Sequence, residues 1–254
     1  LFSFWTQDFM TVDTTFTTAN YREIWDSPIY SLLLRRSLMV SGIVTAVTVL
    51  LAYPVAYFIS FHVHPSKKSI WLFLITIPFW TSYLIRVFLW KVILGYNGVI
   101  NSGLLQLGII DEPLTFILYN VNAVIITLAH AFAPFAILPI FVVLEKIDRS
   151  LLEASQDLGE TKFSTFLRVT LPLSMPGVVG AVLIVFIPTI GDYVTPELMG
   201  GAGGKLIANM IQTQFLQLNN APLGAALAIV AMICVTAISL IFVFLNRKYL
   251  RGRT

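Results

Sequence analysis

A small group of acidic and aromatic residues lies within or beside long apolar runs of this sequence. Its members are Trp80, Tyr83, Phe186, Asp192, Tyr193 and Glu197. A charged side chain in an apolar span is costly and usually functional. Carboxylates attract cations, and aromatic faces bind them with about 0.5–2 kcal/mol, so this group favours handling of a cation. Two other interpretations stay open, because aromatic residues often anchor span ends and Asp192 could pair with Arg86 or cap a helix.

The sequence contains no residue set arranged for catalysis or metal binding. Its single cysteine, Cys234, lies in an apolar run, and no Cys/His or Ser/His/Asp group is placed for nucleophilic chemistry. The glycine-rich stretch 200–205 lacks the spacing of a phosphate-binding loop, and we expect a flexible external loop there. The chain is therefore predicted to be no enzyme and to bind no cofactor or metal.

The composition predicts a polytopic membrane protein. Of the 254 residues, 57% are hydrophobic and 11% are charged, whereas soluble domains carry about 25% charged residues. So few charges cannot cover a soluble surface, and so many apolar residues exclude disorder. A net charge of +3 is too weak to indicate nucleic acid. We therefore expect the protein to be surrounded by lipid.

Apolar stretches of about 20 residues or more are long enough to span a bilayer. Five such stretches occur, at 37–61, 70–94, 121–144, 175–194 and 223–245. Several contain proline, which packed membrane helices tolerate. We therefore expect an all-α fold in which residues 1–254 form a single transmembrane domain.

The basic residues predict the orientation of the spans. Ten of the 16 lysines and arginines would share one side of the membrane: Lys67, Lys68, Lys146, Arg149, Lys162, Arg168, Arg247, Lys248, Arg251 and Arg253. Because positive loops stay inside, the C-terminus is predicted to be cytoplasmic and the segments 1–34 and 195–222 periplasmic. Export of residues 1–34 requires a further span upstream of Leu1, so we expect the native protein to have six spans.

The predicted cytoplasmic segment 145–172 is rich in local signals. Ser150 followed by Glu153 resembles a capping box, and Gly159 suits the left-handed residue that closes a helix. Two short helices joined at Gly159 are expected, with Pro172 at the start of the next element. One face of the first helix would carry Leu151, Ala154 and Leu158, and another would carry Glu153, Asp157 and Glu160. The segment is either a solvated hairpin or a docking element for a soluble partner.

This segment resembles the "EAA" loop of ABC-importer permeases. The matching residues are Glu153, Ala154, Ser155, Gly159, Val169, Leu171 and Pro172, with serine and valine where the pattern has alanine and isoleucine. The stretches 78–86, 144–148 and 191–201 resemble signatures of spermidine/putrescine permeases, especially the first permease of the pair. The resemblance extends from about residue 14 to about 249.

The resemblance implies a type I ABC-importer transmembrane domain of six spans in a bacterial inner membrane. Polyamines would be the cargo, moved by alternating access. The implied partners are a homologous second permease, a homodimer of ATPase subunits that carries ATP and Mg²⁺, and a periplasmic substrate-binding protein. The residues implied in ATPase coupling are Glu153, Ala154, Ser155, Asp157, Gly159, Leu171 and Pro172. The implied substrate pathway contains Asp192, Tyr193, Trp80, Tyr83, Glu197 and Phe186.

Three alternatives remain at this stage. The same importer class could carry iron, thiamine, sulfate or an opine, although Asp192 and Glu197 favour a cation. A stand-alone channel or secondary transporter would leave the 153–172 pattern unexplained. A membrane-embedded enzyme is disfavoured because no catalytic set is present.

Overall fold

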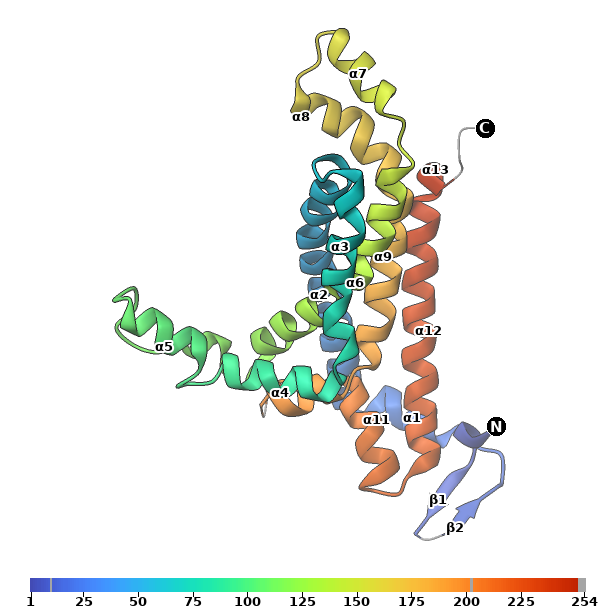
Figure 1. Ribbon diagram of the computed structural model, residues 1–254. Helices are drawn as coiled ribbons and strands as arrows, with labels where there is room; N and C mark the ends of the chain where they lie inside the picture. Colours follow the sequence, from blue (N-terminus) through green and yellow to red (C-terminus); the bar gives the residue numbers. More distant parts are fainter. Residues whose placement is uncertain (10, 202, 251–254) are drawn as a thin grey trace. The chain divides into compact units, whose positions relative to one another are not determined.

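Long apolar helices dominate the computed structural model, which describes residues 1–9, 11–201 and 203–250 (Figure 1). In lipid, a helix is the element that satisfies every backbone polar group within one segment. The four longest helices are α2 (Pro28–Phe61), α6 (Val121–Glu145), α9 (Leu171–Gly191) and α12 (Ala221–Leu245). Among the described residues, four helices are long and apolar enough to cross a membrane, or five if one broken pair is a single span. The predicted helical membrane fold is confirmed.

The predicted span 70–94 is not one continuous helix. It divides into α3 (Pro65–Thr76), a 3-10 turn (Ile77–Trp80) and α4 (Tyr83–Ile93). Thr81 and Ser82 are extended and separate the two helices. Pro78 lies at the break and lacks the N–H that a continuing helix would need. Apolar composition alone does not reveal this interruption.

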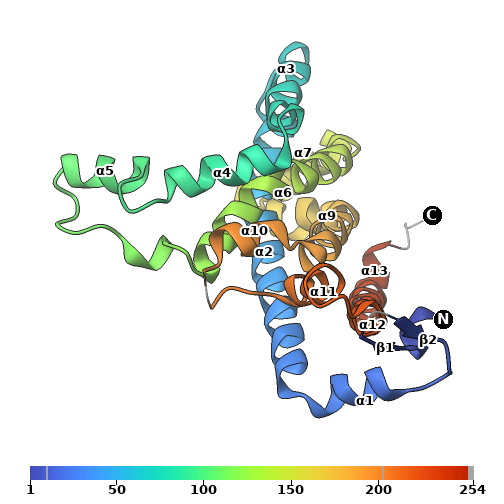
Figure 2. The same ribbon diagram turned by 90° about the horizontal axis from the view of Figure 1, so that it is seen from below.

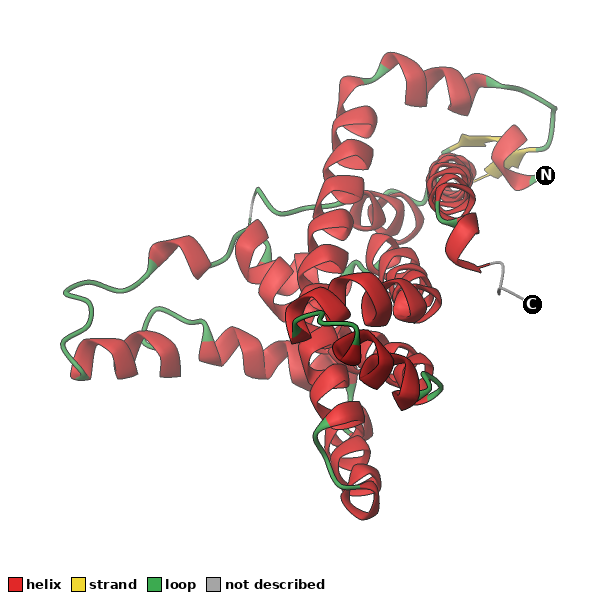
Figure 3. Cartoon of the chain, turned by 90° about the horizontal axis from the view of Figure 1, so that it is seen from above, coloured by secondary structure: helices red, strands yellow, loops and turns green. Residues whose placement is uncertain are grey.

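The N-terminal segment contains the one exception to the all-α prediction among the described residues. Strands β1 (Thr6–Asp8) and β2 (Thr11–Asp13) pair antiparallel, with Thr6 opposite Asp13 (Figure 3). A 3-10 turn (Phe2–Phe4) precedes them, and α1 (Ala19–Asp26) follows. The buried Asn20 amide donates to the carbonyl oxygens of Ser3 and Trp5, at 2.9 and 2.7 Å. These bonds tie the first residues to α1.

Short helices occupy much of the sequence between the long ones. They are α5 (Val99–Gln106), a 3-10 turn (Thr115–Ile117), α10 (Val194–Met199), α11 (Ile207–Leu216) and α13 (Arg247–Leu250). The range 195–222, expected as a loop, therefore contains most of α10 and all of α11 (Figure 2). α9 ends at Gly191, so Asp192 and Tyr193 lie between α9 and α10 rather than inside a span that reaches 194.

Contacts divide the chain into two compact units. The first unit contains Leu1–Val44, Ser82–Leu128 and Ile187–Ile238. The second contains Thr45–Thr81, Ala129–Phe186 and the residues from Ser239 onward. Each of the four longest helices contributes residues to both units. The single transmembrane domain expected from the sequence stays a prediction.

Close packing of α6 against α9 organises the second unit. A Cβ atom added at Gly177 would lie 2.8 Å from the Pro139 carbonyl oxygen and 3.0 Å from the Val143 Cβ. Ala136, Ile140 and Ala181 are fully buried near this contact region. Small residues allow membrane helices to approach closely, where dispersion contacts hold them together. This packing fixes the helix end from which the 145–172 segment leaves.

Candidate functional site

The segment after α6 folds as an exposed hairpin of two helices, α7 (Arg149–Asp157) and α8 (Lys162–Thr165) (Figure 1). Asp148 is the N-cap of α7, and its Oδ1 accepts from the Ser150 N–H at 3.0 Å. This hydrogen bond stabilises the carboxylate and lowers the pKa of Asp148. The helix therefore begins two residues earlier than the capping box at Ser150 predicted, because the aspartate caps the helix instead.

Gly159 closes α7 in the left-handed conformation that the sequence predicted, with φ of +89°. Its N–H donates to the Gln156 carbonyl at 2.9 Å, and the Glu160 N–H donates to the Ser155 carbonyl at 3.2 Å. These two bonds satisfy carbonyl groups that a helix end leaves unpaired. Because the chain turns here, Glu160 does not continue the acidic face of Glu153 and Asp157.

Polar contacts hold α8 against α7. Thr161 caps α8 by accepting from the Ser164 N–H at 3.2 Å, and the hydroxyls of Ser155 and Thr165 lie 3.1 Å apart. Glu160 forms an ion pair with Arg168. A hydrogen bond with the Ser164 side chain, followed by the attraction of Arg168, lowers the pKa of Glu160. The hairpin is thus a defined structure.

The second arm of the hairpin continues into the membrane helix. A π-helical stretch (Phe166–Thr170) links α8 to α9, so one helical run extends from Lys162 to Gly191. Leu171 and Pro172 are the first two residues of α9, as predicted for Pro172, although the helical run itself begins earlier, at Lys162. Single π-helical turns are frequent at functional positions.

The surface of the hairpin combines acidic and apolar side chains. Glu153, Ala154 and Asp157 are exposed. Leu158 is 87% exposed and Phe163 is 70% exposed. Ser155 is half-buried because it faces α8. A surface of this kind suits a protein partner that presents both donors and an apolar recess.

In the first unit, Tyr83 and Asp192 form the centre of an acidic–aromatic cluster. The Tyr83 hydroxyl donates to Asp192 Oδ2 at 2.7 Å and lies 2.7 Å from the buried Thr195 hydroxyl. Asp192 Oδ1 accepts from the N–H of Val194, the first residue of α10, at 3.1 Å. The Arg86 guanidinium carbon lies 5.6 Å from the centre of the Tyr83 ring. α4 and α10 lie side by side and bring these groups together.

Asn209 on α11 joins Tyr193 and Glu197 to this region. Its buried amide donates to the Tyr193 carbonyl at 2.9 Å and to Glu197 Oε2 at 3.1 Å. Its Oδ1 accepts from the Leu206 N–H at 3.0 Å. Neither Asn209 nor Thr195 was predicted as a site residue, since each lies in a range expected to be a loop. The sequence signal that could have identified them is that each is a polar residue among apolar neighbours.

The other two predicted pathway residues belong to the second unit. Trp80 is 78% exposed and makes an edge-on contact with Phe73, with ring centres 5.8 Å apart. Phe186 is buried on α9. The structure thus gathers Tyr83, Asp192, Tyr193 and Glu197 in one unit, whereas Trp80 and Phe186 are placed in the other.

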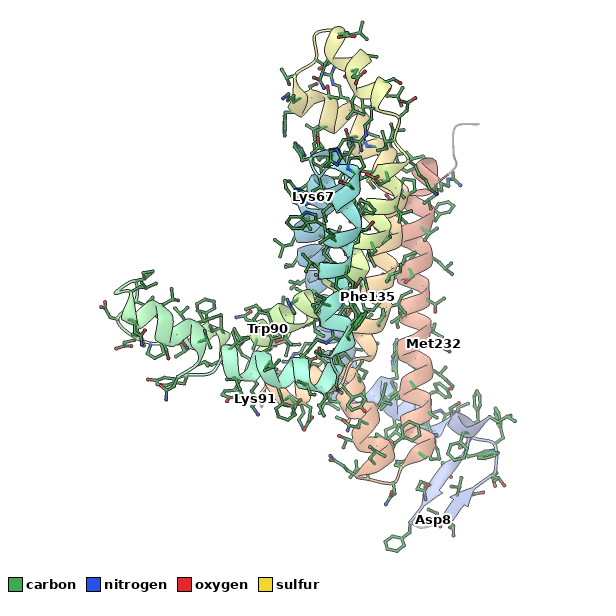
Figure 4. All side chains as sticks on the ribbon, in the orientation of Figure 1. Asp8, Lys67, Trp90, Lys91, Phe135 and Met232 are labelled. Carbon is green, nitrogen blue, oxygen red and sulfur yellow. The ribbon has the colours of Figure 1, made fainter. Side chains whose placement is uncertain are left out.

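The described residues after Gly200 in the 200–205 stretch form a loop, in which Gly201 and Gly204 are closely packed, and its expected flexibility stays a prediction. A Cβ added at Gly201 would lie 2.3 Å from the Tyr119 carbonyl oxygen. The Gly203 carbonyl accepts from Arg36 at 2.6 Å. Tyr119 also lies under Lys91, near the end of α4 (Figure 4), with 5.6 Å between the ammonium nitrogen and the ring centre. Gly201 has φ of +60°, which requires glycine together with this contact.

The long apolar helices and the exposed polar hairpin define a multi-pass helical membrane protein. The chain belongs to the family of binding-protein-dependent transport system inner membrane components, whose pattern matches residues 45–251. It is similar to the spermidine/putrescine transport system permease protein PotB of Haemophilus influenzae, with 40% identity over 93% of this chain and 81% of that protein. PotB of Escherichia coli is 39% identical over 91% of this chain and 83% of that protein.

The fold is similar to that of a solved structure. A chain of a bacterial ABC transporter involved in the import of the acidic polysaccharide alginate matches with a TM-score of 0.70 and 18% identity. The match covers 92% of this chain and 85% of that one. This likeness establishes the fold of an ABC-importer transmembrane domain.

Proposed function

We propose that this chain is the permease subunit of an ATP-driven importer that moves polyamines, spermidine or putrescine, across the inner membrane by alternating access. The observation that carries the proposal is the identity of about 40% to the PotB permeases over most of both chains. Those proteins are named for spermidine/putrescine transport, whereas the alginate transporter shares only the fold.

The acidic–aromatic cluster supports a cationic cargo. Polyamines are flexible molecules with several positive charges, so their path needs carboxylates and aromatic faces. Asp192 and Glu197 supply carboxylates, and Tyr83 and Tyr193 supply aromatic rings in the same unit. Trp80 and Phe186 are proposed as further pathway contacts. An anionic cargo would favour basic groups in their place.

The exposed hairpin supports docking to an ATPase subunit. α7 presents Glu153, Ala154 and Asp157 outward, and hydrogen bonds at Gly159 and Ser155 close its end and hold it against α8. In the orientation proposed from the basic residues, α7 and the C-terminus lie in the cytoplasm, where ATP and Mg²⁺ would bind the ATPase homodimer. The remaining proposed partners are a homologous second permease and a periplasmic binding protein. The permease itself would hold no cofactor.

Competition for uptake tests the proposed cargo. Cells that lack polyamine uptake are supplied with the chain together with its second permease, ATPase and binding protein. We expect them to accumulate labelled spermidine, and unlabelled spermidine or putrescine should compete, whereas iron, thiamine and an opine should not. Accumulation of one of these other solutes with no spermidine uptake would overturn the polyamine assignment and leave the importer class intact.

A further inference from the structure

A cluster of four residues in the second unit joins three membrane helices to α7. Glu145, the last residue of α6, accepts from Lys68 of α3 through both carboxylate oxygens, at 2.7 and 2.8 Å. Its Oε1 also accepts from the Ser60 hydroxyl of α2 at 2.6 Å. Ser60 and Lys68 are thereby held at the end of α6. We refer to Ser60, Lys68, Glu145 and Arg149 as the charged clamp.

The Ser60 carbonyl, in the last turn of α2, lacks the helical partner that interior carbonyls have. It accepts from Lys68 at 2.9 Å and from Arg149 at 2.8 Å. Cations are favoured at a helix C-terminus, where the helix dipole is negative. An ammonium group has three N–H donors, and Lys68 directs them to two Glu145 oxygens and to this carbonyl. Its hydrogen-bonding capacity is fully used, and its side chain is only 15% exposed.

Arg149, the first residue of α7, connects the hairpin to the clamp. Its guanidinium nitrogen lies 3.5 Å from Glu145, and its central carbon lies 3.9 Å from the centre of the Phe61 ring on α2. The connection from α6 to α7 is three residues long and is tightened by the Ile147 N–H donating to the Leu144 carbonyl at 3.2 Å. A displacement of α7 therefore acts directly on the ends of α2, α3 and α6.

We propose that the charged clamp is the positioning element that converts movement of α7 into movement of the membrane helices. This inference rests on the proposed function, in which an ATPase moves α7. Glu145 contacts the other three residues, so it is the centre of the clamp. Lys67 is the matched control for Lys68. It is an exposed lysine on the same helix, α3, and makes no ion pair among the described residues (Figure 4).

The test compares spermidine uptake with ATP hydrolysis in the full transporter, reconstituted in proteoliposomes with the binding protein. Glu145→Ala and Lys68→Ala should each lower the uptake per ATP hydrolysed by about fivefold or more, the usual lower size of a coupling effect. Glu145→Gln keeps the side-chain volume and should give an intermediate loss. Lys67→Ala should match the wild type. The losses in the double variant Lys68→Ala/Glu145→Ala should be less than additive, because the Lys68–Glu145 ion pair is shared by both single changes.

Three results would overturn the clamp. One is that uptake and ATP hydrolysis fall in parallel in Glu145→Gln and Lys68→Ala, so that the uptake per ATP hydrolysed is unchanged. That result would indicate only a loss of stability. Another is an equal loss in Lys67→Ala. The third is additivity of the two single losses. If the wild-type transporter itself shows no ATP-dependent spermidine uptake, the proposed function has failed instead.

Discussion

The contacts of individual residues give Asp192 two roles that a substitution can separate. Its Oδ1 accepts from the Val194 N–H at the start of α10, and its Oδ2 accepts from Tyr83. Both interactions need an acceptor, but neither needs a full charge. Attraction of a cationic cargo does need the charge. The bond to the Val194 N–H at the start of α10 is compatible with a pathway role, and capping by Asp192 stays an open alternative because Tyr193 is the N-cap residue of α10.

Replacing Asp192 by asparagine should reduce spermidine uptake by about tenfold, since a hydrogen bond to a charged group contributes about 1.5–3 kcal/mol. The bond from the Val194 N–H survives because the Asn Oδ1 can still accept it, whereas the amide nitrogen that replaces Oδ2 cannot accept from Tyr83, so the charge and this one bond are lost together. Radiolabelled uptake at several spermidine concentrations measures the effect, with assembly of the transporter checked by co-purification. Asp111→Asn, an exposed aspartate in the same unit, is the control and should be silent. Unchanged apparent affinity and rate in Asp192→Asn would reject direct cation handling.

At the scale of elements, α7 differs in composition and length from the membrane helices. It is short and polar. Its start is fixed by Asp148 and its end by Gly159. Glu153 lies in its middle, and no hydrogen bond or ion pair holds it within the described chain, so its carboxylate is available to a partner. This makes Glu153 the residue at which docking can be tested with little change to the hairpin.

Glu153→Gln should leave α7 folded but weaken ATPase binding by about tenfold, because the lost charged contact is worth about 1.5–3 kcal/mol. Co-purification of the ATPase with the tagged permease, at limiting ATPase concentration, measures this loss. Glu112→Gln makes the same chemical change at an exposed glutamate between α5 and the 3-10 turn at Thr115–Ile117, outside the hairpin, and should have no effect. Normal ATPase binding and normal uptake by Glu153→Gln would refute the docking role.

Local signals predicted some elements and missed others for identifiable reasons. Gly159 was predicted to close a helix, because a left-handed residue is a local requirement that glycine meets. The start of α7 was misplaced by two residues, since Asp148 and Ser150 are both good capping residues and the pattern does not rank them. The break at Thr81 was missed because proline is tolerated in many membrane helices.

At the scale of the whole molecule, the composition predicted the membrane fold, but the contacts that organise the sites are long-range. Lys68 and Glu145 are 77 residues apart, and Tyr83 and Asp192 are 109 residues apart. Hydropathy reports which segments enter lipid and carries no information on which span ends meet. The pairing of Glu145 with Lys68 and the contacts of Asn209 therefore could not be predicted from the sequence.

The central claim is that the complete transporter spends ATP to move a polyamine through this permease. The most direct measurement is uptake of labelled spermidine into proteoliposomes that contain the permease pair and ATPase, with the loaded binding protein on one side and ATP on the other. We expect accumulation that requires both ATP and the binding protein and stops when a non-hydrolysable ATP analogue is substituted. Spermidine flux that proceeds equally without ATP or without the ATPase would contradict it, and would indicate a channel or secondary transporter.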